Sequence, residues 1–189
     1  SLDSGVTWSV QDSKTTEYLQ DVTAPGADGK TLVAVGRGGA IVRSLDSGVT
    51  WSVQDSKTTQ ILAHVTAPGA DGKTLVAVGE GGAIVRSLDS GVSWSVQDSK
   101  TTQTLRHVTA PGADGKTLVA VGDSGTIVRS LDSGVTWSVQ DSKTTQSLWH
   151  VTAPGADGKT LVAVGGGGTI VRSLDSGVSW SVQDSKTPQ

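Results

Sequence analysis

The chain has 189 residues, which suffice for one domain or for a repeat array with a continuous core. It contains 25 Gly but no Cys, Met or Phe, so disulfides and thiolate chemistry are excluded and the core must consist mainly of Val, Ala, Leu and Trp. Its net charge of −3 gives no electrostatic footprint for nucleic acid, and no apolar run approaches the roughly 18 residues of a membrane span. We therefore expect neither nucleic-acid binding nor membrane insertion, while the cellular compartment remains open.

The chain is built from an internal repeat. An octapeptide that starts at Ser1 and ends at Trp8 returns every 43 residues, giving four complete copies and a truncated fifth, 173–189. A period near 43 residues suits a four-stranded propeller blade. A helical repeat of similar length is excluded because each copy is rich in Gly, Thr, Ser and Val and lacks a helical apolar stripe.

Each part of the octapeptide has a physical role. Asp3 can accept hydrogen bonds from backbone N–H groups of the turn that follows it, and Gly5 can supply the positive φ that a tight reversal needs. Val6 and Trp8 then alternate with polar residues, which is the pattern of a half-buried strand. The octapeptide therefore predicts a turn that opens into a strand, with the Trp packed beneath the turn.

The remaining elements of the first copy follow in chain order. Two turns are predicted from Pro and Gly, at 25–29 and 36–39. The apolar run at 31–35 predicts a strand that is buried on both faces. A further strand begins within each octapeptide. We therefore expect four strands per repeat and no helix, and in the first copy the strands are 6–11, 18–24, 31–35 and 40–45.

Ser-x-Asp-x-Gly-x-Thr-Trp resembles the Asp-box, also called the bacterial neuraminidase repeat. All five copies match, with Ser93 and Ser179 replacing Thr. The segments Leu-x-His-Val and Val-Ala-Val-Gly-x-Gly-Gly-x-Ile-Val-Arg-Ser are similar to repeats of the photosystem II assembly and stability factor family. The resemblance covers the whole chain and implies an all-β propeller of four-stranded antiparallel blades, in which the Asp-box caps the hairpin between the last two strands. It implies a structural role for Asp3, Trp8, Asp46, Trp51, Asp89, Trp94, Asp132, Trp137, Asp175 and Trp180.

In this arrangement the chain is one repeat domain, 1–189, that starts with an orphan outer strand. The orphan strand lies within 1–14, and the four blades are expected at about 15–58, 59–101, 102–144 and 145–189. A spare outer strand at the N-terminus can compete with the outer strand at the C-terminus, which makes strand exchange between chains inexpensive. We expect a homodimer in which two chains form one ring of eight blades. A four-bladed monomer and a nine-fold arrangement are the alternatives.

Only eight of the 43 repeat columns vary among the complete copies, and seven of these fall in two clusters, around the start of strand 18–24 and in or beside turn 36–39. Because successive strands run in opposite directions, both clusters should lie at one rim of the ring. Random mutation of exposed positions explains this clustering poorly. The Gln11 and Lys14 columns should also be exposed, yet they are identical in every complete copy. We expect a ligand-binding rim made of Tyr18, Gln20, Arg37, Ile61, Ala63, Glu80, Thr104, Arg106, Asp123, Ser147, Trp149 and Gly166.

The sequence predicts neither a catalytic site nor a metal site. A glycosidase needs two placed carboxyl groups or an activated Tyr, but Glu17 and Glu80 lie in different columns. His64, His107 and His150 share a column, which suggests a metal site, but we expect them to be separated by the channel and to serve packing. The Gly36-x-Gly38-Gly39 turn precedes no helix, so a phosphate loop is excluded.

The favoured function is a non-enzymatic, self-assembling propeller scaffold, natural-derived or designed, with one variable rim that is open to a ligand. No cofactor or metal is expected. A recognition module for glycans or peptides is the first alternative, with Trp149 as the best stacking residue. An assembly factor for a membrane complex is the second, and it rests on the family resemblance alone.

Overall fold

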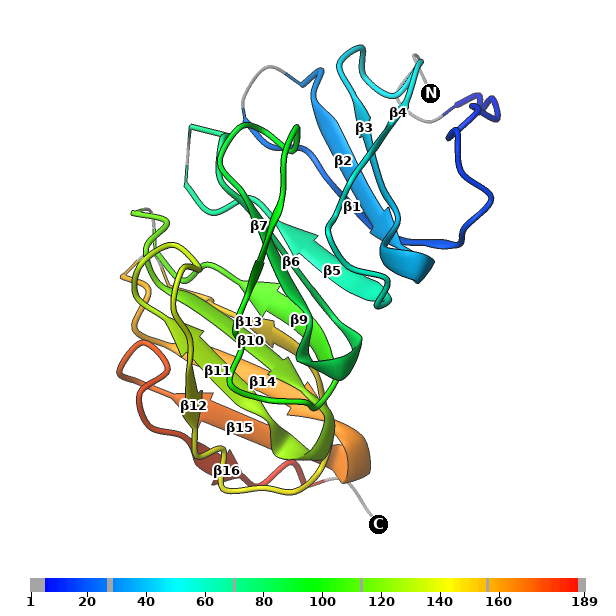
Figure 1. Ribbon diagram of the computed structural model, residues 1–189. Coiled ribbons are helices and arrows are strands. Elements are labelled where there is room, and N and C mark those ends of the chain that lie inside the picture. The colour runs from blue at the N-terminus through cyan, green and yellow to red at the C-terminus, as the bar shows by residue number, and fades with distance from the viewer. Residues whose placement is uncertain (1–5, 27–28, 70, 113, 156, 187–189) are drawn as a thin grey trace.

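The chain forms four antiparallel sheets, each of four strands that are consecutive in sequence (Figure 1). The computed structural model describes residues 6–26, 29–69, 71–112, 114–155 and 157–186. No α-helix occurs in these ranges, and none of their helical turns has the length or apolarity to cross a membrane. The predicted all-β fold with four-stranded antiparallel sheets is confirmed, and we call each sheet a blade.

The four blades repeat the same strand pattern. Blade 1 contains β1 (Leu19–Thr23), β2 (Leu32–Gly36), β3 (Ile41–Ser44) and β4 (Ser52–Gln54). Blade 2 contains β5 (Leu62–Thr66), β6 (Leu75–Gly79), β7 (Ile84–Ser87) and β8 (Ser95–Gln97). Blade 3 contains β9 (Leu105–Thr109), β10 (Leu118–Gly122), β11 (Ile127–Ser130) and β12 (Ser138–Gln140). Blade 4 contains β13 (Leu148–Thr152), β14 (Leu161–Gly165), β15 (Ile170–Ser173) and β16 (Ser181–Gln183).

The core lies between consecutive blades rather than inside one sheet. Contacts between blades are made chiefly by the first strands, β1 with β5, β5 with β9 and β9 with β13. The cluster between blades 2 and 3 joins Val76, Val78 and Ile84 of the former to Leu105, Val108, Leu118, Ala120, Val128 and Trp137 of the latter. Blades 1 and 2 and blades 3 and 4 form matching clusters. Because every blade needs a neighbour on each side, the repeat is stable only as an array.

The four blades form an open fan, with the N-terminal and C-terminal blades at opposite ends (Figure 1). The described residues of blades 1 and 4 form no apolar cluster with each other. Each of these two blades therefore has one face without a neighbouring blade.

A bulge near the start of each first strand shapes the inner surface. In blade 2 the pairing of β5 with β6 shifts between Leu62 and His64. Leu62 and Val65 are buried on either side of this bulge, whereas Ala63 and His64 between them are partly exposed. The bulge thus presents two consecutive side chains of every blade toward the inner surface.

Three details differ from the sequence-based expectation. The turn between the second and third strands is a single 3₁₀ turn in each blade, η1 (Arg37–Gly39), η2 (Glu80–Gly82), η3 (Asp123–Gly125) and η4 (Gly166–Gly168). The prediction of no helix is confirmed apart from this three-residue turn, which the Ala40 amide closes in blade 1 by donating to the Arg37 carbonyl at 3.0 Å. The outer strands are shorter than predicted because 49–51 belong to the Asp-box turn, where the Val49 and Thr50 amides donate to Asp46.

The predicted orphan strand is the third difference. Residues 6–12 form no strand in the single chain, because the third strand of every blade is already paired with that blade's own outer strand. Val6 and Trp8 are exposed, and so is Val10. The prediction that Trp8 is a core residue was therefore wrong for the single chain. Asp3 lies outside the described residues.

Candidate functional site

The Asp-box closes the outer hairpin of each blade with a compact set of hydrogen bonds. In blade 1 the Asp46 carboxylate accepts from the Thr50 amide at 2.8 Å, the Thr50 hydroxyl at 2.7 Å and the Ser44 hydroxyl at 2.8 Å. These donors, the Thr50 amide first, lower the pKa of Asp46 to about 2. Gly48 has the positive φ predicted for this column, but Ser47 also has a φ of 59°, which the sequence does not indicate. The Asp-box is thus a structural device, as expected.

The tryptophan of the Asp-box packs beneath the turn in three blades. Trp94, Trp137 and Trp180 are buried, and each indole N–H donates to the glycine carbonyl three residues earlier. Trp51 makes the same hydrogen bond at 3.0 Å but is only partly buried, because none of the described residues forms a blade that packs against this face of blade 1. The prediction of a core Trp column is therefore confirmed for three copies and met in part for Trp51.

The repeated arginine column ties each blade to the next, as its interpretation as a blade contact predicted. The Arg43 Nε donates to the Ser90 carbonyl at 2.7 Å, and Arg86 and Arg129 repeat the contact one blade further on. Arg172 is exposed at the end of the chain. Arg43, Arg86 and Arg129 each donate to the serine carbonyl in the Asp-box of the next blade, so the equivalent acceptor for Arg172 belongs to the column of Ser47, the serine of the blade 1 Asp-box.

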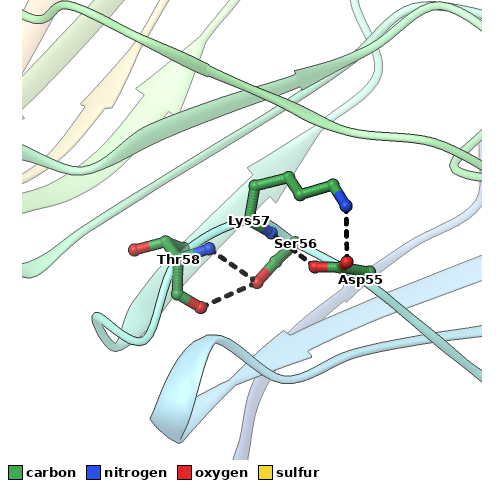
Figure 2. Close-up of polar contacts among 4 residues, drawn as sticks. All are labelled: Asp55, Ser56, Lys57 and Thr58. Atoms are coloured by element: carbon green, nitrogen blue, oxygen red, sulfur yellow. Dashed lines mark hydrogen bonds and ion pairs between the residues drawn. The ribbon is translucent and has the colours of Figure 1, made fainter.

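The link from one blade to the next is a small polar turn (Figure 2). The Asp55 carboxylate accepts from the Lys57 amide at 3.0 Å and pairs with the Lys57 ammonium at 2.5 Å. The Ser56 hydroxyl donates to the Thr58 carbonyl at 3.0 Å (Figure 2). Ser56 is buried, so the turn is packed as well as bonded.

The variable rim gathers around one hollow of about 370 Å³. Eight of the twelve predicted rim residues line it, Gln20, Arg37, Ile61, Ala63, Glu80, Thr104, Arg106 and Trp149. They come from all four blades, so the hollow lies where the blades converge. Tyr18, Asp123, Ser147 and Gly166 do not line it. That the hollow binds a ligand stays a prediction.

The rim side chains pair differently in each blade. In blade 3 the Arg106 guanidinium forms a bidentate ion pair with Asp123, at 2.5 and 3.1 Å. In blade 1 the Arg37 guanidinium lies 5.0 Å from the centre of the Tyr18 ring, which is a cation–π contact. In blade 4, Gly166 offers no side chain to cover Trp149, and the indole remains 56 % exposed. Trp149 is thus the one aromatic residue among those that line the hollow, and it is exposed.

The histidine column corrects an expectation. His64, His107 and His150 are not separated by a channel, because consecutive rings stack with centroids 3.8 Å apart. Asp21 begins the stack and lies 3.4 Å from the His64 Nε2. Burial, followed by the imidazoles on either side, lowers the pKa of His107 to about 3. In the described residues no three His, Asp or Glu side chains are arranged so that they could hold a metal ion. The column makes contacts between blades instead, where the Val65 amide donates to Asp21 at 2.9 Å.

The two end faces of the array expose residues that are buried elsewhere. On blade 1, Leu19 is 40 % and Val22 is 55 % exposed, and with Ala34 and Trp51 they border a largely apolar hollow of about 330 Å³. On blade 4, Val164 is 42 % exposed, whereas the equivalent residue of each other blade is fully buried. Sequence reasoning did not identify these faces, because the exposed residues are identical to their buried counterparts in the other repeats.

No family model matches the chain, and no curated protein matches it. Among solved structures, the chain is similar to YCF48 from Cyanidioschyzon merolae, with a TM-score of 0.66 and 20% identity over 89% of this chain and 56% of that one. It also resembles YCF48 bound to D1 peptide, with a TM-score of 0.54 and 17% identity over 92% and 85%. A GH74 enzyme from Niastella koreensis matches with a TM-score of 0.66 and 15% identity over 82% and 27%. The chain thus spans only part of the length of these proteins, about half in the first case.

These similarities show the fold. The chain is an all-β propeller array of Asp-box-like repeats, and it is structurally similar to YCF48 and to GH74 propeller domains. Because the identities are so low, neither the peptide bound by one YCF48 structure nor the activity of the GH74 enzymes follows for this chain.

Proposed function

We propose that this chain is a non-enzymatic, self-assembling propeller scaffold, in which two chains close one ring of eight blades around the variable rim. The observation that carries the proposal is the match between its two uncovered faces. They are the two halves of an interface that occurs three times within the chain. A ring is the natural closure for such a head-to-tail contact, because each face finds its complement on the second chain.

The apolar residues support this pairing. The junction between blades 3 and 4 packs Val119, Val121 and Ile127 against Leu148 and Val151, among others. Blade 4 presents the same three types of residue on its outer face, where Val162, Val164 and Ile170 are only partly covered. Blade 1 presents the complement, with Leu19 and Val22 exposed. Exposed apolar patches of this kind mark protein interfaces.

The open arrangement of the array also favours more than four blades. Blades 1 and 4 lie at opposite ends of the fan, and their described residues form no apolar cluster with each other (Figure 1). A closed ring of four blades would bring these two blades together, so the ring needs further blades, which a second chain supplies.

Polar contacts cross two of the three junctions within the chain at the histidine column, whereas at the third the buried His107 Nδ1 has no hydrogen-bond partner among the described residues. The Val108 amide donates to the His64 Nδ1 at 3.4 Å across a blade junction. At the junction between chains, the Val22 amide of one chain would donate to His150 of the other. In the same way Arg172 would donate to the Ser47 carbonyl of the second chain.

Replacing Val164 by Glu should abolish the dimer, because a carboxylate would be buried in the apolar junction without a partner. We expect the dissociation constant to rise by at least about 100-fold, measured by sedimentation velocity over a concentration series. Val139→Glu is the matched control, since Val139 lies on the outer strand of blade 3 and is 55 % exposed. The proposal fails if both variants associate like the unmodified chain.

The second candidate function is a recognition module for glycans or peptides at the rim. The exposed Trp149 beside Arg106 and Arg37 in one hollow favours it. A YCF48 structure holds a D1 peptide, which keeps open a role as an assembly factor for a membrane complex. Both of these functions need a ligand at the rim, whereas the scaffold does not.

Binding to arrays of glycans and peptides should separate these functions. If the chain is a recognition module, we expect a bound ligand whose affinity falls at least about 10-fold in Trp149→Ala, since stacking on an exposed indole is lost. Lys57→Ala is the control, because it removes an exposed side chain of a column that does not vary. Absence of binding to every array leaves the scaffold function.

A further inference from the structure

The N-terminal segment duplicates the outer strand of blade 4. Residues 6–16 and 178–188 differ only where Thr7 is replaced by Ser179 and Thr16 by Pro188. In the single chain the C-terminal copy forms β16, whereas residues 6–12 form no strand. The N-terminal copy lies beside the Asp-box of blade 1, where the two border a hollow of about 300 Å³. One chain therefore carries five copies of the outer-strand segment, at 6, 49, 92, 135 and 178, but four blades that can hold one.

The link that follows the N-terminal copy already has the conformation found between blades. The Asp12 carboxylate accepts from the Lys14 amide at 2.9 Å, and the Ser13 hydroxyl donates to the Thr15 carbonyl at 3.1 Å. Lys14 has a φ of 62°, and Lys57, its equivalent in the next link, has a φ of 64°. The N-terminal link is thus preformed for a junction between two blades.

Within the chain, such a link lies against the inner turn of the blade that it leaves. At Gly39 an added Cβ would approach the Thr58 carbonyl oxygen closely, so this link and the turn of blade 1 are in tight contact. In a closed ring, blade 4 of one chain precedes blade 1 of the other. Two segments could then occupy the outer-strand position of blade 4. One is the C-terminal copy of its own chain, and the other is the N-terminal copy of the second chain, which the link of that chain follows.

Both copies have the link conformation, since Lys186 has a φ of 51° and its amide donates to Asp184 at 2.9 Å. The pattern within the chain favours the N-terminal copy of the second chain. Every outer strand of blades 1 to 3 continues through its link into the first strand of the next blade, and at the junction between chains only the N-terminal copy continues in this way, into β1. Resting on the proposed ring, we infer that residues 6–12 of each chain form the outer strand of blade 4 in the other chain and displace the C-terminal copy.

The exchange is tested by two substitutions in the same repeat column, made in the full chain. Trp8 is 80 % exposed in the single chain, whereas Trp180 is buried. With exchange, Trp8 becomes the core residue of the junction, so Trp8→Ala should raise the dimer dissociation constant by roughly 100-fold. Trp180→Ala should leave that constant unchanged or lower it, because the competing strand is weakened. The inference would be overturned if Trp180→Ala raised the dimer dissociation constant while Trp8→Ala left it unchanged.

Hydrogen exchange of the unmodified dimer gives a second readout that needs no variant. Peptides from the two copies can be distinguished by mass, because one contains Thr7 and the other Ser179. Exchange predicts protected amides at 8–11 and fast exchange at 180–183, and the reverse pattern contradicts it. A dimer with the reverse pattern would leave the ring standing, whereas a monomer would remove the ring and the exchange together.

Discussion

Replacing Trp137 by Ala should lower the free energy of unfolding by about 3–5 kcal/mol, the cost of deleting a large buried aromatic side chain. Trp137 is 4 % exposed and packs among residues of blades 2 and 3. Its indole N–H also donates to the Gly134 carbonyl at 3.1 Å, so truncation leaves a cavity and an acceptor without its donor. Urea unfolding followed by circular dichroism measures the loss.

Trp149→Ala is the control for this measurement. Trp149 is 56 % exposed on the rim, and we expect its removal to change stability by less than about 1 kcal/mol. Equal losses in the two variants would contradict the assignment of the Asp-box Trp to the core between blades.

Replacing Gly122 by Ala should destabilise the chain by about 3 kcal/mol or more. Gly122 has an extended φ of −166°, so its backbone conformation would suit any residue. The obstacle is space, because an added Cβ would lie 1.9 Å from the Thr104 carbonyl oxygen. That carbonyl also accepts from the Asp123 amide at 2.9 Å, which fixes it in place. Only a shift of two strands could make room.

Gly81→Ala is the matched control in the turn of blade 2. An added Cβ there would meet nothing nearer than the Gln60 side chain at 3.6 Å, and only the positive φ of 62° opposes it. Blade 3 has Ser124 in this column, with a φ of 54°. We expect a loss of roughly 1 kcal/mol, from thermal or urea unfolding. A larger loss than for Gly122→Ala would show that close approach is not the reason for the repeated glycine.

Most of the fold could be predicted because the repeat is nearly exact. The Asp46 column with its positive-φ glycine specifies a turn, and the Val-rich run specifies a strand in every copy, which is buried in blades 2 and 3. The 3₁₀ turns were missed because Gly-rich segments indicate a turn without indicating its type. Ser47 shows the same limit, since its positive φ is imposed by the hydrogen bonds around it.

The rest depends on which neighbour a repeat has, and sequence alone does not give this. Val121 and Val164 occupy one column, yet one is buried and the other exposed, because no blade packs against this face of blade 4 in the described residues. The segment 6–11 has the sequence of a strand but is not part of a sheet in the described residues. The histidine stack was misjudged because it depends on the spacing of the first strands. Eight of the twelve predicted rim residues line one hollow, but their position does not show whether a ligand binds there.

The account depends most on two chains forming one closed ring. Multi-angle light scattering of the unmodified chain, coupled to gel filtration at micromolar concentration, tests this most directly. The account predicts a single species with twice the mass of one chain. A species with the mass of one chain at every concentration would contradict it, since the apolar faces of blades 1 and 4 would then remain uncovered.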